Sequence, residues 1–309
     1  MEAGPRAAMN SGRASGSLKL NALQGTRLLS LALNLPGPAA LQRLHAMGAR
    51  CTQVLPPSGD PMAQYSPRAQ QQLCRGIWQT TLDLKSPVGQ RRLHALLGRA
   101  DVLLTSFRPA ALRRLGLEAA ALRARYPKLC TVAIVGAAGA RADEPGHDLS
   151  YQAEAGLVPG LEMPVSLLAD MAGALLASEA VLQVLAQRQR SGSGAHREVS
   201  LTEAAHWLAL PRQWGLTSTG ALLGGGQATY RIYPCLDGRV ALAALEPHFA
   251  AALARLVGLA GPGGAAAAPD WGSAQAHRAV AAFMAQRSCA QLEQLAMTHD
   301  LPLHILPVG

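Results

Sequence analysis

Aromatic residues and lysine are both scarce in this chain of 309 residues. Aromatics make up 4%, and lysine occurs only at Lys19, Lys85 and Lys128, so arginine supplies nearly all of the 28 basic residues. The net charge is +9, but the arginines are spread along the chain without a basic run or interleaved aromatics. Nucleic-acid-binding domains concentrate both features. We therefore expect no nucleic-acid partner, while the positive field favours an anionic small ligand.

Cysteine is also infrequent. The chain has five cysteines, Cys51, Cys74, Cys130, Cys235 and Cys289, and no Cys-x-x-Cys motif. The odd number and wide spacing indicate a reducing compartment, with neither a disulfide framework nor a zinc site. We therefore predict a cytoplasmic protein without a metal, in which the cysteines are buried small apolar residues.

Clean hydrophobic runs of membrane-spanning length are missing too. The longest apolar stretch, residues 166–190, carries Glu179 and Arg188 among its alanines and leucines. It predicts a long helix that is almost wholly buried, and no membrane partner. Residues 1–22 are rich in glycine, serine and alanine and lack the apolar core of a secretory signal. We expect them to form a disordered extension.

Short apolar runs alternate with amphipathic stretches over the first half of the chain. Such alternation predicts βαβ units and a parallel, Rossmann-like open sheet. Ser86 followed by Pro87 marks a helix start, with Ser86 as the N-cap. The predicted strands are residues 26–33, 50–55, 79–84, 101–106 and 128–135, and the predicted helices are residues 37–49, 86–97, 109–117 and 118–127.

The second half of the chain has a different pattern. Residues 136–164 are rich in loop-forming residues, and "RSGSGAHREVS" at 190–200 predicts a flexible connector. Residues 229–245 predict a hairpin around the turn "LDG", and helices follow from Pro247. We therefore predict an α/β protein with a large Rossmann-like domain over residues 23–200 and a smaller α+β domain with linker helices over residues 201–309.

Three polar residues occupy positions that chemistry or simple helix capping would explain equally well. Asp170 stands where the long apolar helix begins, as an N-cap does. His147 in "PGHDLS" is typical of a surface loop, and Glu246 before Pro247 is typical of a helix start. The triple glycine in "LLGGGQATY" is typical of a flexible turn.

The ordered combination of motifs is more informative than any one of them. The stretch from "LQGTRLLSLALNLPGPAALQRLHAMGAR" through "LDLKSPVGQRRLHALLGRADVLLTSFRPAALRRLGL" resembles the first half of family III CoA-transferases, the CaiB/BaiF family. Further on, "GHDLSY", "SLLADMAGA", "GGGQATYRIYPCLDGR" and "ALEPHF" are most similar to the α-methylacyl-CoA racemase branch. The resemblance begins near Leu23 and covers the rest of the chain.

The resemblance implies a fold, an assembly and a reaction. It implies a two-domain α/β homodimer that acts on a CoA thioester, with CoA present only as part of the substrate. The family pattern continues beyond Gly309, so the large domain is expected to be incomplete at this end. In the racemase branch, His147 and Asp170 would exchange the proton on the α-carbon and Glu246 would support them. A thioester acidifies that proton, and inversion requires a base on one face and an acid on the other.

Two other functions remain open under the same resemblance. In the transferase branch, the position of Asp170 holds the nucleophile that forms an aspartyl-CoA thioester, although that branch usually has tyrosine in place of His147. The chain would otherwise be an inactive acyl-CoA-binding paralogue.

Residues that contact CoA are also implied by the resemblance. Arg75, Lys85, Arg108 and Gly136 match positions expected near the cofactor portion of the substrate. The family usually carries cations where this chain has Gln53, Ile77 and Trp78. Because charge-assisted contacts to phosphate are strong, their loss predicts weaker CoA binding.

Overall fold

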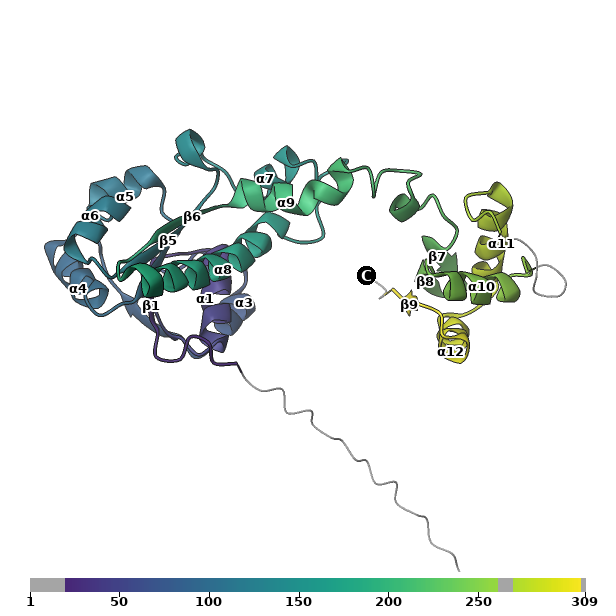
Figure 1. The fold of residues 1–309 in the computed structure, drawn as a ribbon, viewed down its shortest axis with the longest axis horizontal. Coiled ribbons are helices and arrows are strands. Elements are labelled where there is room, and N and C mark those ends of the chain that lie inside the picture. The colour runs from purple at the N-terminus through teal and green to yellow at the C-terminus, as the bar shows by residue number, and fades with distance from the viewer. Residues whose placement is uncertain (1–19, 261–268, 307–309) are drawn as a thin grey trace, which may run out of the picture. The chain divides into compact units, whose positions relative to one another are not determined.

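The chain forms two compact units in a computed structural model that describes residues 20–260 and 269–306. The first unit ends at Leu208 and the second begins at Ala209 (Figure 1). The predicted N-terminal extension, residues 1–22, lies almost entirely outside the described residues.

The first unit is built on a parallel sheet of six strands in the order β3-β2-β1-β4-β5-β6. This confirms the predicted α/β fold with a parallel, Rossmann-like sheet, and each of the five predicted strands overlaps an observed one. The inner strands are short apolar runs because both of their faces are covered. The strands are β1 (Arg27–Ser30), β2 (Arg50–Leu55), β3 (Trp78–Thr81), β4 (Val102–Thr105), β5 (Cys130–Val135) and β6 (His196–Ser200).

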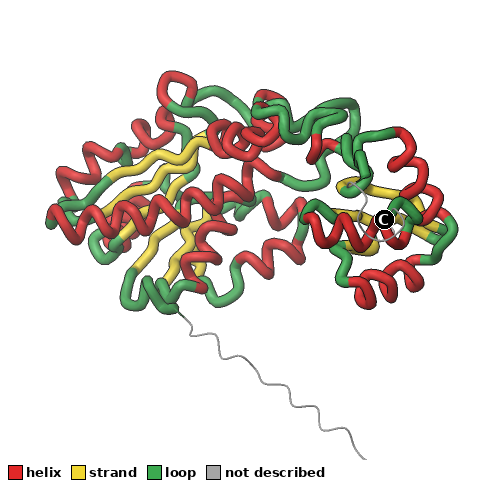
Figure 2. The backbone as a smooth tube through the Cα atoms, turned by 45° about the vertical axis from the view of Figure 1, so that its right-hand side comes forward, coloured by secondary structure: helices red, strands yellow, loops and turns green. Residues whose placement is uncertain are grey.

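Helices cover both faces of this sheet (Figure 2). On one face, leucines of the strands and helices form a buried cluster that includes Leu29, Leu93, Leu103 and Leu122. On the other face, α1 and α8 pack together, and α8 also packs on β5 and β6. The helices of this unit are α1 (Pro36–Ala46), α2 (Met62–Tyr65), α3 (Pro67–Leu73), α4 (Pro87–Leu97), α5 (Pro109–Leu115), α6 (Ala119–Arg125), α7 (Asp148–Glu154), α8 (Leu168–Ser191) and α9 (Leu201–Gln213), of which α9 crosses the unit boundary.

The strand order reverses between β1 and β4, which are neighbours in the sheet although β2 and β3 lie between them in sequence. The chain leaves β1 toward one side and β4 toward the other, so a crevice opens outside their carboxyl ends. The first turn after β1 is "NLPGP" and not a glycine-rich dinucleotide fingerprint. Gly37 in this turn lets α1 approach closely, since a Cβ there would lie 2.4 Å from Cβ of Ala32.

Helix α8 is more exposed than the sequence predicts. Its length and apolarity alone would suit a membrane span, and 44% of its most apolar window is buried. It packs against α1, β5 and β6, as the core helix of a folded unit does. It is not almost wholly buried, because Met171, Leu175 and Leu182 are exposed. Alanine and leucine are distributed all around this long helix, so the sequence does not indicate which of its faces points outward.

Three further segments correct the sequence prediction. Residues 196–200, predicted as part of a flexible connector, form β6 at the edge of the sheet. Of this strand only Val199 and Ser200 are buried, so its sequence is mostly polar. The stretch predicted as loop-rich contains the short helix α7. Residues 62–73, for which no element was predicted, form α2 and α3. The predicted N-cap at Ser86 is confirmed, because its Oγ accepts a hydrogen bond from the Gly89 N–H.

The second unit contains the predicted hairpin, joined by a third strand. Strands β7 (Tyr230–Cys235), β8 (Gly238–Ala243) and β9 (Leu303–Ile305) form an antiparallel sheet in that order. Their core includes Tyr233, Val240 and Met284. The helices that follow the hairpin in the described part of this unit are α10 (Pro247–Leu256), α11 (Ala274–Ala285) and α12 (Cys289–His299). The strand β9 was not predicted, because its three residues lie among prolines.

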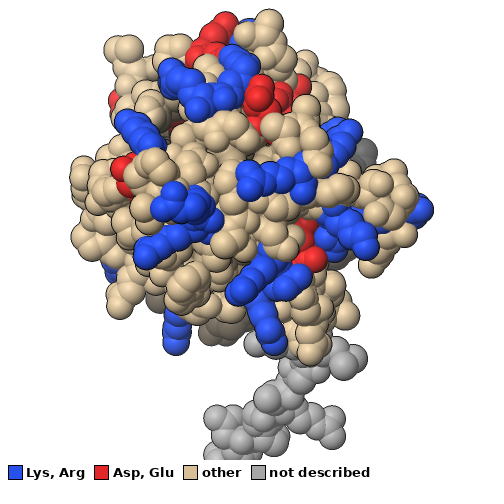
Figure 3. Space-filling model, turned by 90° about the vertical axis from the view of Figure 1, so that its left-hand side faces the viewer, with Lys and Arg blue, Asp and Glu red and all other residues tan. Residues whose placement is uncertain are grey.

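Basic side chains are distributed over the surface of the first unit in separate groups. Figure 3 shows lysine and arginine side chains spread over one face, with acidic groups and broad uncharged surface between them. Several of these basic groups are engaged in ion pairs, such as Arg113 with Asp143 at 3.1 Å. The distribution on this face lacks the continuous stripe that tracks a nucleic-acid backbone.

Candidate functional site

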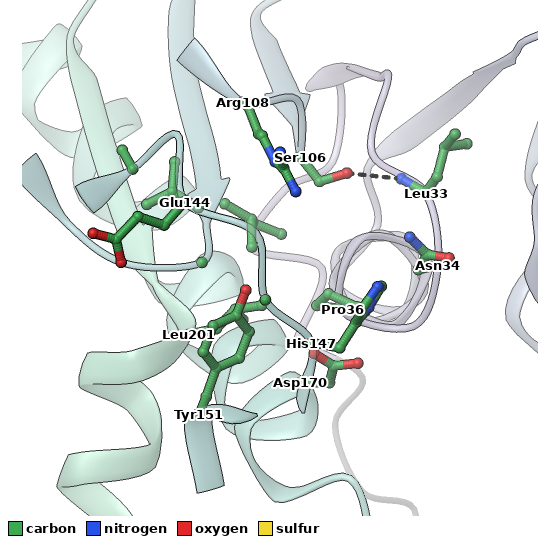
Figure 4. A pocket seen from close by; sticks show the side chains of 15 residues that line it. Leu33, Asn34, Pro36, Ser106, Arg108, Glu144, His147, Tyr151, Asp170 and Leu201 are labelled. Atoms are coloured by element: carbon green, nitrogen blue, oxygen red, sulfur yellow. Dashed lines mark hydrogen bonds between the residues drawn. The ribbon is translucent and has the colours of Figure 1, made fainter. Parts of the chain in front are cut away.

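A cavity of about 200 Å³ lies at the point where the strand order reverses. Its walls come from the turn after β1, the turn after β4, the end of β5 and the beginnings of α7 and α8. It is therefore the crevice in which doubly wound α/β folds bind ligands. Figure 4 shows Asp170 and His147 at one end of this cavity, beside Pro36, with Ser106 and Arg108 across it.

The two turns at the switch point are tied together. Ser106 Oγ accepts a hydrogen bond of 3.1 Å from the Leu33 N–H, which fixes the end of β1 against the end of β4 (Figure 4). Arg108 follows as the N-cap residue of α5, and its exposed guanidinium lines the cavity. Within residues 20–260 and 269–306, Arg108 forms no ion pair with a carboxylate. Its charge is available to an anionic ligand.

His147 is the N-cap residue of α7, and its imidazole lines the cavity. Ser150 Oγ reaches back to the backbone of His147, accepting from its N–H at 3.0 Å and donating to its carbonyl at 2.7 Å. The helix start is therefore satisfied by serine, and the histidine side chain remains exposed to the cavity. The predicted surface loop is thus a helix start that faces a ligand-sized space.

The start of α8 is capped by Asp148, a residue 22 positions earlier in the sequence. Asp148, the first residue of α7, is 5% exposed, and its Oδ1 accepts a hydrogen bond of 2.9 Å from the Asp170 N–H. Its other oxygen accepts from Gln152 Nε2, which also donates to the Ser166 carbonyl at 3.0 Å. Simple N-capping, the alternative explanation for Asp170, does not apply. Asp170 is the third residue of α8, and Leu167 occupies the N-cap position.

Because Asp148 performs the capping, the Asp170 carboxylate is left free. It lines the cavity and, over the described part of the chain, has no hydrogen-bond partner. Burial in the cavity wall, followed by the nearby charge of Asp148, raises the pKa of Asp170 to about 7. Desolvation therefore dominates the proton affinity of this carboxyl, although it lies in the first turn of a helix. A carboxyl group with this pKa can both release and accept a proton near neutral pH.

Tyr151 is a cavity residue to which sequence reasoning assigned no role. Its ring fits between two glycines: a Cβ at Gly136 would lie 2.3 Å from its hydroxyl oxygen, and one at Gly146 would lie 2.5 Å from its ring. Thr202 holds Gly136 in place through two hydrogen bonds of 2.9 Å to its carbonyl. Burial, followed by the charge of Asp170, raises the pKa of Tyr151, so the hydroxyl keeps its proton. The available signal was the spacing of "GHDLSY", which places His147 and Tyr151 one helical turn apart.

A second cavity, of about 530 Å³, lies beside the first at the carboxyl ends of β2, β3 and β4. Leu55, Leu82 and Phe107 give it apolar walls, and Lys85 supplies a cation. Phe107 lines this cavity and its neighbour Arg108 lines the first, so the turn after β4 contributes to both.

The structure does not bring every predicted CoA contact to these cavities. Lys85, Arg108 and Gly136 line them, whereas Arg75 lies before β3, at the amino edge of the sheet. Two of the positions where cations were expected are interior. Gln53 is fully buried and accepts a hydrogen bond of 2.8 Å from Gln79, and Ile77 belongs to the core.

The remaining predicted features lie in the second unit. Glu246 is the N-cap residue of α10. The triple glycine lines a cavity of about 830 Å³ together with Tyr230, Ile232 and His277. Both features belong to the unit that begins at Ala209.

Comparisons with known proteins agree with this geometry. A family model described as CoA-transferase family III matches residues 23–306. Human alpha-methylacyl-CoA racemase is 30% identical over 256 residues, which cover 77% of this chain and 65% of that protein. The probable fatty acyl-CoA transferase Rv3272 of Mycobacterium tuberculosis is 32% identical over 201 residues, which cover 59% of this chain and 51% of that protein.

Comparison of the structure with solved structures finds a protein of the same family. A crystal structure of Rv3272 from Mycobacterium tuberculosis superposes with a TM-score of 0.80 at 25% identity, covering 93% of this chain and 84% of that one. The chain spans less than two thirds of the length of the two curated relatives, at 65% and 51%. Proteins named as racemases and as transferases are therefore similar to this chain at nearly the same level of identity.

Proposed function

Since the chain belongs to CoA-transferase family III, we propose that it epimerises the α-carbon of a 2-methylacyl-CoA thioester by 1,1-proton transfer. The observation that carries this proposal is the carboxyl of Asp170, which lies in the same cavity as His147, has a pKa raised to about 7 and has no hydrogen-bond partner among residues 20–260 and 269–306. Acid/base catalysis is most effective when the catalytic pKa lies near the working pH.

In the proposed reaction, one of the two groups removes the α-proton and the other returns a proton to the opposite face. The intermediate is an enolate, whose oxygen carries the developing charge. The helix-start N–H of Asp170 is already bonded to Asp148, so it is not free to stabilise this oxygen. The Tyr151 hydroxyl, which keeps its proton, and the Arg108 guanidinium are two donors among the residues that line the same cavity.

The CoA portion of the substrate would extend from the first cavity into the second. Phe107 and the apolar walls suit an adenine ring, and Lys85 and Arg108 suit phosphates. Lys85→Met should weaken CoA binding about tenfold and reduce its salt dependence. Lys128→Met removes an exposed lysine that lines neither cavity and is the matched control. Equal affinities for the two variants would contradict the assignment.

The decisive experiment is α-proton exchange. The protein is incubated in D₂O with a panel of 2-methylacyl-CoA thioesters, and loss of the α-hydrogen signal is followed by NMR. We expect exchange in the native protein and in Glu179→Gln, which removes an exposed carboxylate from the same helix. Exchange should be lost in Asp170→Asn. Exchange at the native rate in both Asp170→Asn and His147→Ala would overturn the proposal.

A second function is CoA transfer, with Asp170 as the nucleophile. It is favoured by the free carboxylate facing the cavity and by the similarity to proteins named as transferases. This mechanism forms an aspartyl-CoA thioester, which hydroxylamine or borohydride traps at Asp170. A trapped adduct with no α-proton exchange would select transfer. Binding of CoA with neither reaction would leave an inactive acyl-CoA-binding paralogue.

Other features implied by the resemblance remain predictions. These are a supporting role for Glu246, a homodimer, a cytoplasmic location and CoA present only as part of the substrate. Glu246→Gln tests the first, because loss of a supporting carboxylate should slow exchange without abolishing it.

A further inference from the structure

Two cysteines far apart in sequence meet in the second unit. Cys235 is the last residue of β7 and Cys289 is the first residue of α12, and their Sγ atoms lie 3.4 Å apart. Both side chains are partly exposed. This corrects the expectation that all five cysteines are buried apolar residues, which holds for Cys51 and Cys130 only.

The surroundings hold the two sulfur atoms together. Asp237 Oδ1 accepts a hydrogen bond of 2.7 Å from the Cys289 N–H, which fixes the start of α12 to the hairpin turn. Gly238 pairs with Cys235 across the hairpin, and a Cβ there would lie 2.8 Å from Cys289 Sγ. The absence of a side chain at Gly238 is therefore what makes room for the Cys289 sulfur.

From this arrangement we propose that Cys235 and Cys289 form a site of reversible oxidation, which a peroxide converts into an intramolecular disulfide. The bridge would join the end of the β7–β8 hairpin to the start of α12. The site is independent of the proposed reaction, because it uses residues of the second unit alone.

The chemistry is balanced by the peroxide. The Cys235 thiolate attacks one peroxide oxygen, so that an S–O bond forms, the O–O bond breaks and water leaves after protonation. The Cys289 sulfur then attacks the resulting sulfenic acid, an S–S bond forms, and the hydroxyl group leaves with the thiol proton as water. Two thiols are oxidised to one disulfide, and one peroxide is reduced to two waters. An added dithiol reverses the bridge.

Both thiols contact the same carboxylate. Asp237 Oδ1 lies 3.8 Å from Cys235 Sγ, and hydrogen bonding with Cys235 and then Asp237 raises the pKa of the Cys289 thiol to about 12. We write Cys235 as the thiol that meets the oxidant and Cys289 as the resolving thiol, and the same disulfide forms if the two roles are exchanged. The same three groups could offer ligands to a metal ion. That alternative requires deprotonation of Cys289 and engages an Asp237 oxygen that already accepts a backbone hydrogen bond.

Trypsin makes the test direct, because the chain has Arg231, Arg239 and Arg287 at suitable positions. Cys235 is the only cysteine of peptide 232–239, and Cys289 lies in the peptide that begins at Ser288. The reduced full-length protein is treated with limiting hydrogen peroxide, alkylated and digested without reductant. We expect the two peptides to be joined, to separate on addition of dithiothreitol, and to be accompanied by a higher Tm of the oxidised protein.

Matched variants make the result specific. Cys235→Ser and Cys289→Ser should each abolish the joined peptides and the Tm shift, whereas Cys74→Ser, which removes another partly exposed thiol, should leave both unchanged. Gly238→Ala should slow bridge formation several-fold, because its Cβ displaces the Cys289 sulfur.

Three outcomes would overturn the proposal. The first is full alkylation of both cysteines after peroxide treatment that oxidises Cys74. The second is a bridge between two chains, which a non-reducing gel reveals as a doubled mass. The third is zinc retained by the purified protein and lost in Cys235→Ser, with no joined peptides, which would assign the pair to a metal instead.

Discussion

Two aspartate carboxylates meet near the start of α8, one from Asp148 in α7 and one from Asp170 in α8 itself. They differ in their hydrogen bonding. Asp148 is 5% exposed and accepts hydrogen bonds from the Asp170 N–H and from Gln152. Asp170 faces the cavity and, in the part of the chain that the structure describes, its carboxylate accepts none. One carboxylate is saturated by donors and organises the backbone, whereas the other is left free for a ligand.

The two roles depend on each other. A helix start has several unpaired N–H groups, one of which is usually satisfied by the side chain of the N-cap residue. Leu167 at this position has no acceptor atom in its side chain, so Asp148 reaches across from α7 and accepts the Asp170 N–H instead. The charge of Asp148 also contributes to the raised pKa of Asp170. The capping residue therefore both frees the cavity carboxyl and tunes its proton affinity.

The largest expected effect is on activity at Asp170. Asp170→Asn keeps the size of the side chain and removes its ability to exchange a proton, so α-proton exchange should fall about 10³-fold. The Tm at neutral pH should not fall, since the carboxylate has no hydrogen-bond partner among the described residues. Exchange rates and thermal melting of the same preparation check both parts. A Tm loss as large as that of Asp148→Ala would show that Asp170 is structural.

The next largest effect is on stability at Asp148. Asp148→Ala leaves the Asp170 N–H and the Gln152 amide without their acceptor in a buried site, so the free energy of unfolding should fall by about 2–4 kcal/mol. Asp143→Ala is the matched control, because Asp143 also accepts a backbone N–H at a helix start, from Ala110 at 2.8 Å, but is exposed. Its cost should be clearly smaller than that of Asp148→Ala, because solvent replaces the lost acceptor. Urea unfolding followed by circular dichroism measures both, and equal losses would contradict the contrast.

A third effect concerns pH. The pKa of Asp170 is raised from 3.8 to about 7 on folding, so between these values the folded chain binds this proton more tightly than the unfolded chain. The contribution of Asp170 to stability is therefore present at low pH and is lost as the pH rises toward 7. Above that pH, Asp170→Asn should be more stable than the native chain by about 1–3 kcal/mol, allowing for the partial exposure of the carboxyl. Parallel stability curves for the two proteins across this range would show that Asp170 is not desolvated.

The sequence allowed the sheet to be predicted better than the site. Inner strands such as β4 and β5 are apolar runs because both of their faces are covered, and the serine–proline start of α4 is a local signal. The edge strand β6 is mostly polar, so its pattern is that of a connector. Its place in the sheet is decided by pairing with β5, which no local pattern records.

The site depends on contacts between residues that are distant in sequence. The motifs identified His147 and Asp170, and both line one cavity. Local rules then made Asp170 the cap of its own helix, because a residue 22 positions earlier cannot be recognised as its replacement. The direction of its pKa shift was likewise hidden, since burial outweighs the helix dipole only when the cavity walls are known. The Cys235–Cys289 pair was missed for the same reason.

The smallest effect tests whether Asp148 tunes Asp170 by charge. Asp148→Asn keeps an acceptor oxygen for the Asp170 N–H and removes the negative charge, so the pKa of Asp170 should move to lower values. The measurement is NMR titration of carbon-13-labelled aspartate carboxyls, with the Asp170 signal assigned by its loss in Asp170→Asn. Glu144→Gln is the control, because Glu144 lines the same cavity but does not contribute to this shift. If both variants left the titration midpoint of Asp170 unchanged, desolvation alone would set it, and the two aspartates would be linked only through the backbone hydrogen bond.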